Sequence, residues 1–122
     1  MLRILIIEDH KDFRQAVRQF LELNHLKAQI MEAGSGEEGV IMARKSKPRV
    51  VIMGFDLEGI NSIEAASWIK ENDSKCHIIM LTMFDATEIV MSERNRDIKA
   101  FIGKSEIYDQ LIPTIDKCLN NN

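Results

Sequence analysis

Residues 2–9 read LRILIIED, an almost continuous aliphatic run that ends in two adjacent acids. Such a run is typical of a strand covered on both faces of a parallel sheet, because no face meets solvent. Similar apolar runs follow at Ala28 to Ala33, Val50 to Met53, Ile78 to Leu81 and Ala100 to Ile102. A stretch with helical spacing comes after each run, so the alternation predicts five parallel strands joined by right-handed crossovers through five helices.

The helical stretches carry their own start signals and apolar faces. Capping-box pairs predict three helix starts, at Ser35 with Glu38, Asn61 with Glu64 and Asp85 with Glu88. The fourth helix has the weakest pattern, because residues 92–97 are polar on every face. One face of the first helix is apolar through Phe13, Ala16, Val17, Phe20 and Leu21, and one face of the last through Tyr108, Leu111, Ile112, Ile115, Cys118 and Leu119.

A proline lies inside the last helical pattern. Pro113 has no backbone N–H, so we expect it to kink that helix or to split off its first turn.

The polarity of the runs predicts the order of the strands. The second run (28–33) contains polar residues and the fifth (100–102) is short, as is typical of sheet edges. These edges fit the α/β, flavodoxin-like doubly wound sheet with strand order 2-1-3-4-5. No internal repeat, low-complexity tract or linker interrupts the 122 residues, so residues 1–122 are predicted to form a single domain.

Composition excludes several classes of protein. With 16 basic and 19 acidic residues and a net charge of -3, the chain has no electrostatic reason to bind nucleic acid. Its apolar runs are too short to cross a membrane. No signal-peptide pattern precedes the first run, so we expect a cytoplasmic protein. Cys76 and Cys118 have no metal-binding spacing, which predicts two buried, reduced thiols.

Polar side chains follow the predicted strands where ligands bind in this class of sheet, beyond the carboxyl ends of the strands. The first strand ends in Glu8 and Asp9, the fourth in Thr82 and the fifth in Lys104. Adjacent acids suit a hard cation such as Mg²⁺, and an ammonium with a hydroxyl suits the oxygens of a phosphoryl group. The third strand ends in Gly54, which offers no nucleophile to such a group.

Four stretches resemble response-regulator receivers, particularly the NarL/FixJ branch. They are Ile4–His10 with Arg14, Val51–Ala65, Ile79–Thr82 and Ala100–Ser105. The resemblance implies phosphotransfer from a histidine kinase to an aspartate at the end of the third strand. It also implies a Mg²⁺ site, a hydroxyl and an amine that sense the phosphoryl group, and an aromatic residue that reorients. By position these roles match Glu8, Asp9 and the backbone carbonyl of Asp56 for the metal, Thr82 for the hydroxyl, Phe101 for the aromatic residue and Lys104 for the amine.

The departures from the family pattern change the expected function. Gly54 stands at the phosphoacceptor position, Glu58 replaces a usual Pro, and Ser62 replaces a usual Gly. We therefore expect a pseudo-receiver, a regulatory interaction domain that is not an enzyme, requires no cofactor and binds Mg²⁺ weakly or not at all. Lys104 is expected to pair directly with Glu8 or Asp9.

Two other functions compete with the pseudo-receiver. In the first alternative the chain is an active receiver of a transcriptional response regulator, phosphorylated at a substitute residue such as Asp56. A flavin-binding domain is disfavoured because the loop after the first strand carries acids where the flavin phosphate would lie. His10, His25 and His77 do not stand at ligand spacing, so none is predicted to bind metal. The partner classes are a second copy in a homodimer, a DNA-binding effector domain, or another signalling protein.

Overall fold

The computed structural model describes residues 1–24, 26–83 and 97–120. Five parallel strands form one sheet in the order β2-β1-β3-β4-β5. The predicted flavodoxin-like fold and strand order are confirmed, with β2 and β5 at the edges. The strands are β1 (Leu2–Ile7), β2 (Ala28–Ala33), β3 (Val50–Gly54), β4 (His77–Thr82) and β5 (Ala100–Gly103).

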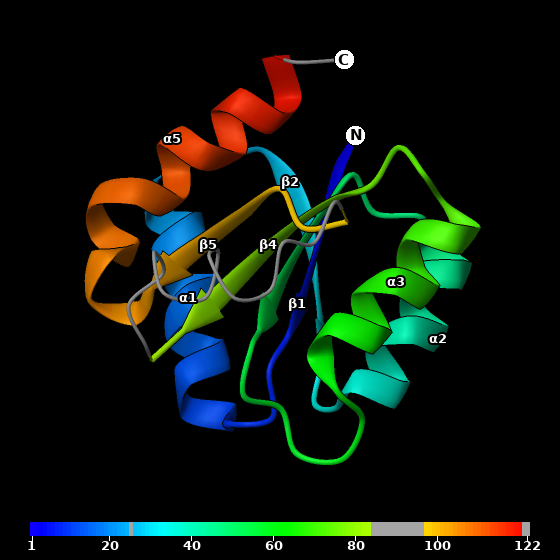
Figure 1. Cartoon of the computed structure of the whole chain (residues 1–122). Helices are drawn as coiled ribbons and strands as arrows, with labels where there is room; N and C mark the ends of the chain where they lie inside the picture. Colours follow the sequence, from blue (N-terminus) through cyan, green and yellow to red (C-terminus); the bar gives the residue numbers. More distant parts are fainter. Residues whose placement is uncertain (25, 84–96, 121–122) are drawn as a thin grey trace.

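Helices cover both faces of this sheet (Figure 1). Helices α1 and α5 lie on one face, and α2 and α3 lie on the other. The described helices are α1 (Lys11–Leu23), α2 (Gly36–Ser46), α3 (Ser62–Asn72), the 3-10 helix η1 (Lys104–Glu106) and α5 (Ile107–Asn120). The predicted fourth helix falls on residues 84–96, outside the described residues.

Alternate residues of the central strands feed two separate cores. In β1, Ile4 and Ile6 pack toward α1 and α5, whereas Leu5 and Ile7 pack toward α2 and α3. All four side chains are at most 1% exposed. Burying one such side chain stabilises the fold by about 1.5–3 kcal/mol, so the two-sided burial explains the aliphatic run.

Two of the three predicted capping boxes fall within the described residues, and both helix starts are confirmed. The Ser35 hydroxyl accepts the Glu38 amide at 3.1 Å. The Asn61 side chain accepts the amides of Ile63 and Glu64 at 2.8 and 3.3 Å. Each bond satisfies an amide that has no partner inside the helix. The third box, Asp85 with Glu88, lies outside the described residues.

Helix α5 departs from its sequence prediction in two ways. It continues from Ile107 to Asn120 with Pro113 inside, so of the two outcomes predicted for Pro113, a kink or a split-off first turn, the split-off turn is wrong. Pro113 and Asp109 are both exposed, so water can bond the Asp109 carbonyl that loses its helical partner. Tyr108, placed on the apolar face by its spacing, is 81% exposed and meets the Phe20 ring edge-on, with centroids 5.1 Å apart.

Both cysteines are buried and free, as predicted. Burial is the main cause that raises the pKa of the Cys76 thiol, to about 12, so this thiol stays protonated and unreactive. None of the described helices has both the length and the apolar character that a membrane span requires.

Candidate functional site

The predicted site residues meet at the carboxyl edge of the sheet. Strand pairing places Ile7 beside Met53, Gly54 beside Leu81, and Thr82 beside Gly103. Because the strands are parallel, the residues that follow these ends share one edge. Glu8 therefore lies next to Gly54, and Lys104 starts η1 directly after β5.

The space beside Gly54 is filled by the carboxylate of Glu8. A Cβ atom added to Gly54 would lie 2.6 Å from Glu8 Oε1 and 3.2 Å from Glu8 Cδ. Gly54 does not have a positive φ, so its backbone conformation does not require glycine. What any side chain at this position would meet is Glu8, whose exposure is only 4%.

Lys104 completes a charged pair with that same carboxylate. Its Nζ lies 3.8 Å from Glu8 Oε1, which confirms the predicted direct ion pair. The ammonium also lies 4.3 Å from the centroid of the Phe13 ring, a cation–π contact with α1. The Lys104 side chain, 22% exposed, is thus held between β1 and α1.

His10 lies in the acidic cluster, and the prediction that it binds no metal stays a prediction. Its backbone N–H donates to Glu8 Oε2 at 3.0 Å. Its Nδ1 lies 3.3 Å from Glu8 Oε2 and 3.2 Å from Asp9 Oδ1. The ligand atoms of Glu8, Asp9 and His10 all lie within 4.8 Å of one another. The sequence distance between histidines gave no sign of this, because the partners are carboxylates adjacent in the chain.

A backbone amide in the loop after β3 holds Asp9. Glu58 N–H donates to Asp9 Oδ2 at 3.0 Å. Burial opposes ionisation of Asp9, but hydrogen bonding to Glu8 and to the Glu58 amide, together with His10, keeps its pKa below the ordinary value. A proline at position 58 has no N–H and could not make this bond. The departure at Glu58 therefore supplies a donor to one of the two acids.

Thr82 and Phe101 lie on the strands beyond Gly54. Thr82 is fully buried at the end of β4. Phe101 is half-buried on β5 and meets the Phe55 ring edge-on, with centroids 6.4 Å apart. Phe55 follows Gly54 directly, and its amide donates to Leu81 O at 2.8 Å. The aromatic residue is thereby in contact with the loop that begins at position 54.

Asp56 stands apart from the acids of β1. It is exposed, and it is not a member of the Glu8, Asp9 and His10 cluster. In the same loop Ser62, 4% exposed, donates its hydroxyl to Phe55 O at 2.7 Å. Ser62, which replaces the usual Gly of the family, therefore makes a buried hydrogen bond that holds the loop against the start of α3.

Two arginines of α1 support the acidic edge from the side of β2. Arg14 Nε and one terminal nitrogen of Arg18 each lie 2.9 Å from a different oxygen of Glu32. Arg14 also donates to the Glu8 backbone carbonyl at 2.8 Å. The hydrogen bond to Arg14 is the largest cause that lowers the pKa of Glu32, and it outweighs the opposing effect of burial.

Glu32→Gln is expected to lower the free energy of unfolding by about 1–2 kcal/mol at neutral pH. The folded-state pKa lies below the ordinary value of 4.5, so this stabilisation is present above pH 4.5 and is lost as the pH falls through the folded pKa. Urea unfolding at neutral and acidic pH measures the difference. Glu22→Gln is the control, because Glu22 is 54% exposed in its pair with Arg18. An unchanged difference between wild type and Glu32→Gln on acidification would contradict the ionic origin.

The model of the response regulator receiver domain matches residues 4–116. This chain belongs to that family. Receiver relatives include the transcriptional regulatory protein LiaR of Bacillus subtilis, 39% identical over 84 residues, or 69% of this chain and 40% of LiaR. The nitrate/nitrite response regulator protein NarP of Escherichia coli is 27% identical over 93% of this chain and 53% of its own length. The chain thus spans about half the length of the curated relatives it matches.

Solved receiver structures share the fold. A LuxR-family two-component response regulator from Aurantimonas has a TM-score of 0.88 at 24% identity, over 98% of this chain and 86% of its own. The response regulator TrrA from Thermotoga maritima, in complex with Mg²⁺ and BeF, has a TM-score of 0.84 at 24% identity, over 97% and 99% of the two chains.

Proposed function

We propose that this receiver domain is a pseudo-receiver, a regulatory protein-interaction domain that is not switched by phosphorylation at position 54. A receiver accepts its phosphoryl group on a carboxylate that attacks phosphorus in line with the leaving group. Gly54 has no such carboxylate. The single observation that carries the proposal is that Glu8 Oε1 lies 2.6 Å from the place of a Cβ at Gly54. The pocket around the missing acceptor is occupied by the chain itself.

The pair between Glu8 and Lys104 supports a fixed pocket. In an active receiver the lysine contacts the phosphoryl group, whereas among the described residues Lys104 pairs with the buried Glu8 carboxylate, 3.8 Å away. Removing one partner from a fully buried ion pair costs about 3–5 kcal/mol, because the other charge is left uncompensated, and with Lys104 22% exposed the cost here is expected to be smaller. The pair therefore holds Lys104 toward β1 without any phosphate.

Receiver domains bind Mg²⁺ in an acidic pocket, and the residues of this chain fit that ion only in part. Mg²⁺ requires near-octahedral oxygen coordination, usually with more than one carboxylate. Here the third carboxylate is absent at Gly54, Glu8 faces Lys104, and Asp9 accepts the Glu58 amide. Weak or absent Mg²⁺ binding follows, with no cofactor required. The Asp56 backbone carbonyl remains a proposed ligand in any residual site.

Calorimetric titration with Mg²⁺ is expected to give no saturable binding to the wild-type chain at millimolar concentrations. Gly54→Asp restores the third carboxylate and is expected to tighten Mg²⁺ binding by at least about tenfold. Gly54→Asn, of equal size and without charge, serves as the control. Saturable binding to the wild type at sub-millimolar Mg²⁺ would contradict the proposed weak site.

The output of the domain is proposed to be protein contact in the cytoplasm, without enzymatic activity. Its partner is a second copy in a homodimer, an effector domain or another signalling protein. LiaR and VraR of Staphylococcus aureus are described as a transcriptional regulatory protein and a response regulator, and both are longer than this chain. A transcriptional regulator is therefore the parent protein that these relatives favour, with nucleic acid left to another domain.

Incubation with Mg²⁺ and acetyl phosphate, followed by intact-mass measurement, tests the proposal. The wild-type chain is expected to gain no acid-labile phosphoryl group. An adduct on any residue would overturn the proposal, and mapping it to Asp56 would favour the alternative, an active receiver with a substitute acceptor. Asp56→Asn is the matched variant for that outcome, because an adduct on Asp56 would disappear.

A further inference from the structure

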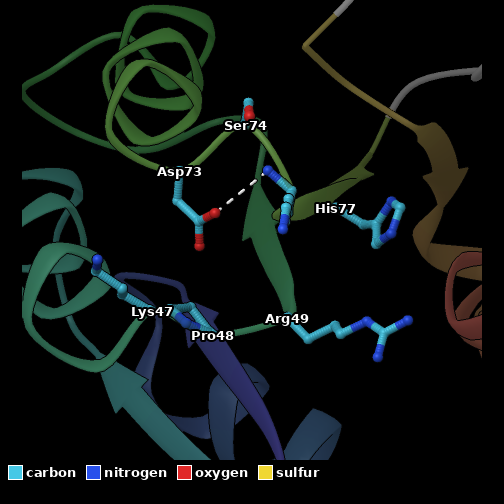
Figure 2. Close-up of a pocket in the computed structure, with 7 residues that line it drawn as sticks. Lys47, Pro48, Arg49, Asp73, Ser74 and His77 are labelled. Carbon is cyan, nitrogen blue, oxygen red and sulfur yellow. Dashed lines mark hydrogen bonds between the residues drawn. The ribbon is translucent and has the colours of Figure 1, made fainter. Parts of the chain in front are cut away.

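A hollow lies at the amino-terminal edge of the sheet, opposite the acidic edge (Figure 2). It has a volume of about 660 Å³, within the range of small-molecule sites, about 300–1,000 Å³. Its lining comes from two connections, residues 47–49 between α2 and β3 and residues 73–75 between α3 and β4, with His77 at the start of β4. The hollow is therefore separate from the acidic edge that carries Glu8.

The charge of this hollow is positive. Lys47, Arg49 and Lys75 line it against one acid, Asp73, whose carboxylate accepts the Lys75 backbone N–H at 3.2 Å. Burial and then the repulsion from the cations of Lys70, Lys99 and Arg49 lower the pKa of His77. His77 is thus neutral at neutral pH. The cations that lower its pKa lie on α3 (Lys70), just before β5 (Lys99) and just before β3 (Arg49).

Part of the positive charge at this edge of the sheet, on Arg49 of the hollow and on the nearby Arg3 and Lys70, stabilises the fold. Helix carboxyl ends carry partial negative charge, which basic side chains offset. At helix carboxyl ends, Arg3 donates to Ser46 O at 3.1 Å and Arg49 donates to Leu119 O at 3.3 Å. Lys70 donates to the carbonyls of Ser74 and Cys76 in the connection between α3 and β4, each at 2.7 Å.

The ammonium groups of Lys47, at the carboxyl end of α2, and of Lys75 make no such bond to a carbonyl in the described residues. Neither makes a hydrogen bond or an ion pair with another residue in the described part of the chain, and both side chains are exposed. Lys47 ends α2 with a φ of 48°, the left-handed conformation in which many helices end. Two lysines whose ammonium groups have no partner among the described residues therefore line a hollow whose surrounding cations disfavour protonation of His77.

We propose that this hollow binds a small polyvalent anion of the phosphate class. The ammonium groups of Lys47 and Lys75 hold its oxygens from the two connections, and Pro48, Arg49, Asp73, Ser74 and His77 complete the lining. Inorganic polyphosphate and a nucleoside diphosphate share this chemistry. The site is independent of Gly54, so it gives the domain a ligand input that needs no phosphoryl transfer.

NMR titration of the His77 imidazole in the full chain, with and without millimolar pyrophosphate, tests the proposal. A bound anion offsets the surrounding cations, so the pKa of His77 is expected to rise. His10 is the internal control, since it lies at the opposite edge, and its imidazole resonances are expected not to move when pyrophosphate is added. ADP is titrated in parallel: tighter binding than pyrophosphate indicates a nucleotide, and weaker binding indicates inorganic phosphate.

Lysine variants tie the response to the hollow. Lys75→Gln and Lys47→Asn, in which asparagine tolerates the left-handed backbone, are each expected to weaken pyrophosphate binding about three- to tenfold. Lys11→Gln removes an exposed charge at the other edge and is expected to leave the affinity unchanged. An unshifted His77 at millimolar pyrophosphate, or equal affinities for all three variants and the wild type, would overturn the proposal.

Discussion

Gly54→Asp is expected to lower the free energy of unfolding by about 2–4 kcal/mol in Mg²⁺-free buffer at neutral pH. The new Cβ displaces the Glu8 carboxylate, which lies 2.6 Å from its place, and puts another negative charge beside two acids. Glu8 is 4% exposed, so water screens that repulsion poorly. Millimolar Mg²⁺ is expected to recover most of the loss, because the cation neutralises the three carboxylates. Urea unfolding with and without Mg²⁺ measures both effects.

Two control variants separate charge from size in this prediction. Gly54→Ala adds only the Cβ, which moves the flexible end of Glu8, and is expected to cost less than about 1.5 kcal/mol. Gly54→Asn has nearly the same shape as the aspartate without its charge. If Gly54→Asn is as unstable as Gly54→Asp, and Mg²⁺ rescues neither, then crowding and not the carboxylate is the cause.

The double variant Glu8→Asp, Gly54→Asp is expected to gain phosphoryl transfer that the wild-type chain lacks. Shortening Glu8 by one methylene withdraws its carboxylate from the space at position 54, so the new aspartate has room and Lys104 is free to meet the phosphoryl group. Intact mass after incubation with Mg²⁺ and acetyl phosphate is expected to show a larger phosphorylated fraction than in Gly54→Asp alone.

The corresponding pair with asparagine is the control for the gain. Glu8→Asp, Gly54→Asn has the same volume at position 54 and no nucleophile, so no adduct is expected. Absence of an adduct in both double variants would mean that the rest of the pocket, and not only Gly54, has lost the capacity for transfer.

The fold was predictable because its main determinants are local patterns. Consecutive aliphatic residues in β1 and β3 indicated strands buried on two faces, and the polar residues of β2 placed that strand at an edge. The differences between the predicted and the observed α5 concern Tyr108 and Pro113, whose behaviour depends on their exposure to solvent. Spacing put Tyr108 on the apolar face, but at the start of the helix it lies beside α1 and mostly in solvent. Pro113 is tolerated because it faces water.

The site was predictable in its location and only partly in its contacts. Parallel strands bring Glu8, Gly54 and Lys104 to one edge, so their proximity followed from the order of the elements. The direction of the Glu8 carboxylate depends on the space that Gly54 leaves for want of a side chain. The hydrophobic periodicity of the sequence carries no information about that direction. The role of Glu58 had a signal in the sequence, since replacing a usual Pro restores an N–H donor, here to Asp9.

The most direct measurement of the central claim is a crystal structure of the wild-type chain grown with Mg²⁺ and beryllofluoride, a phosphoryl mimic. It is expected to contain no beryllofluoride bonded to a carboxylate, and to show the Glu8 carboxylate beside Gly54 and within ion-pair distance of Lys104, as here at 3.8 Å. Beryllofluoride bonded to Glu8, Asp9 or Asp56, with Lys104 turned toward it, would contradict a pocket closed to phosphoryl transfer.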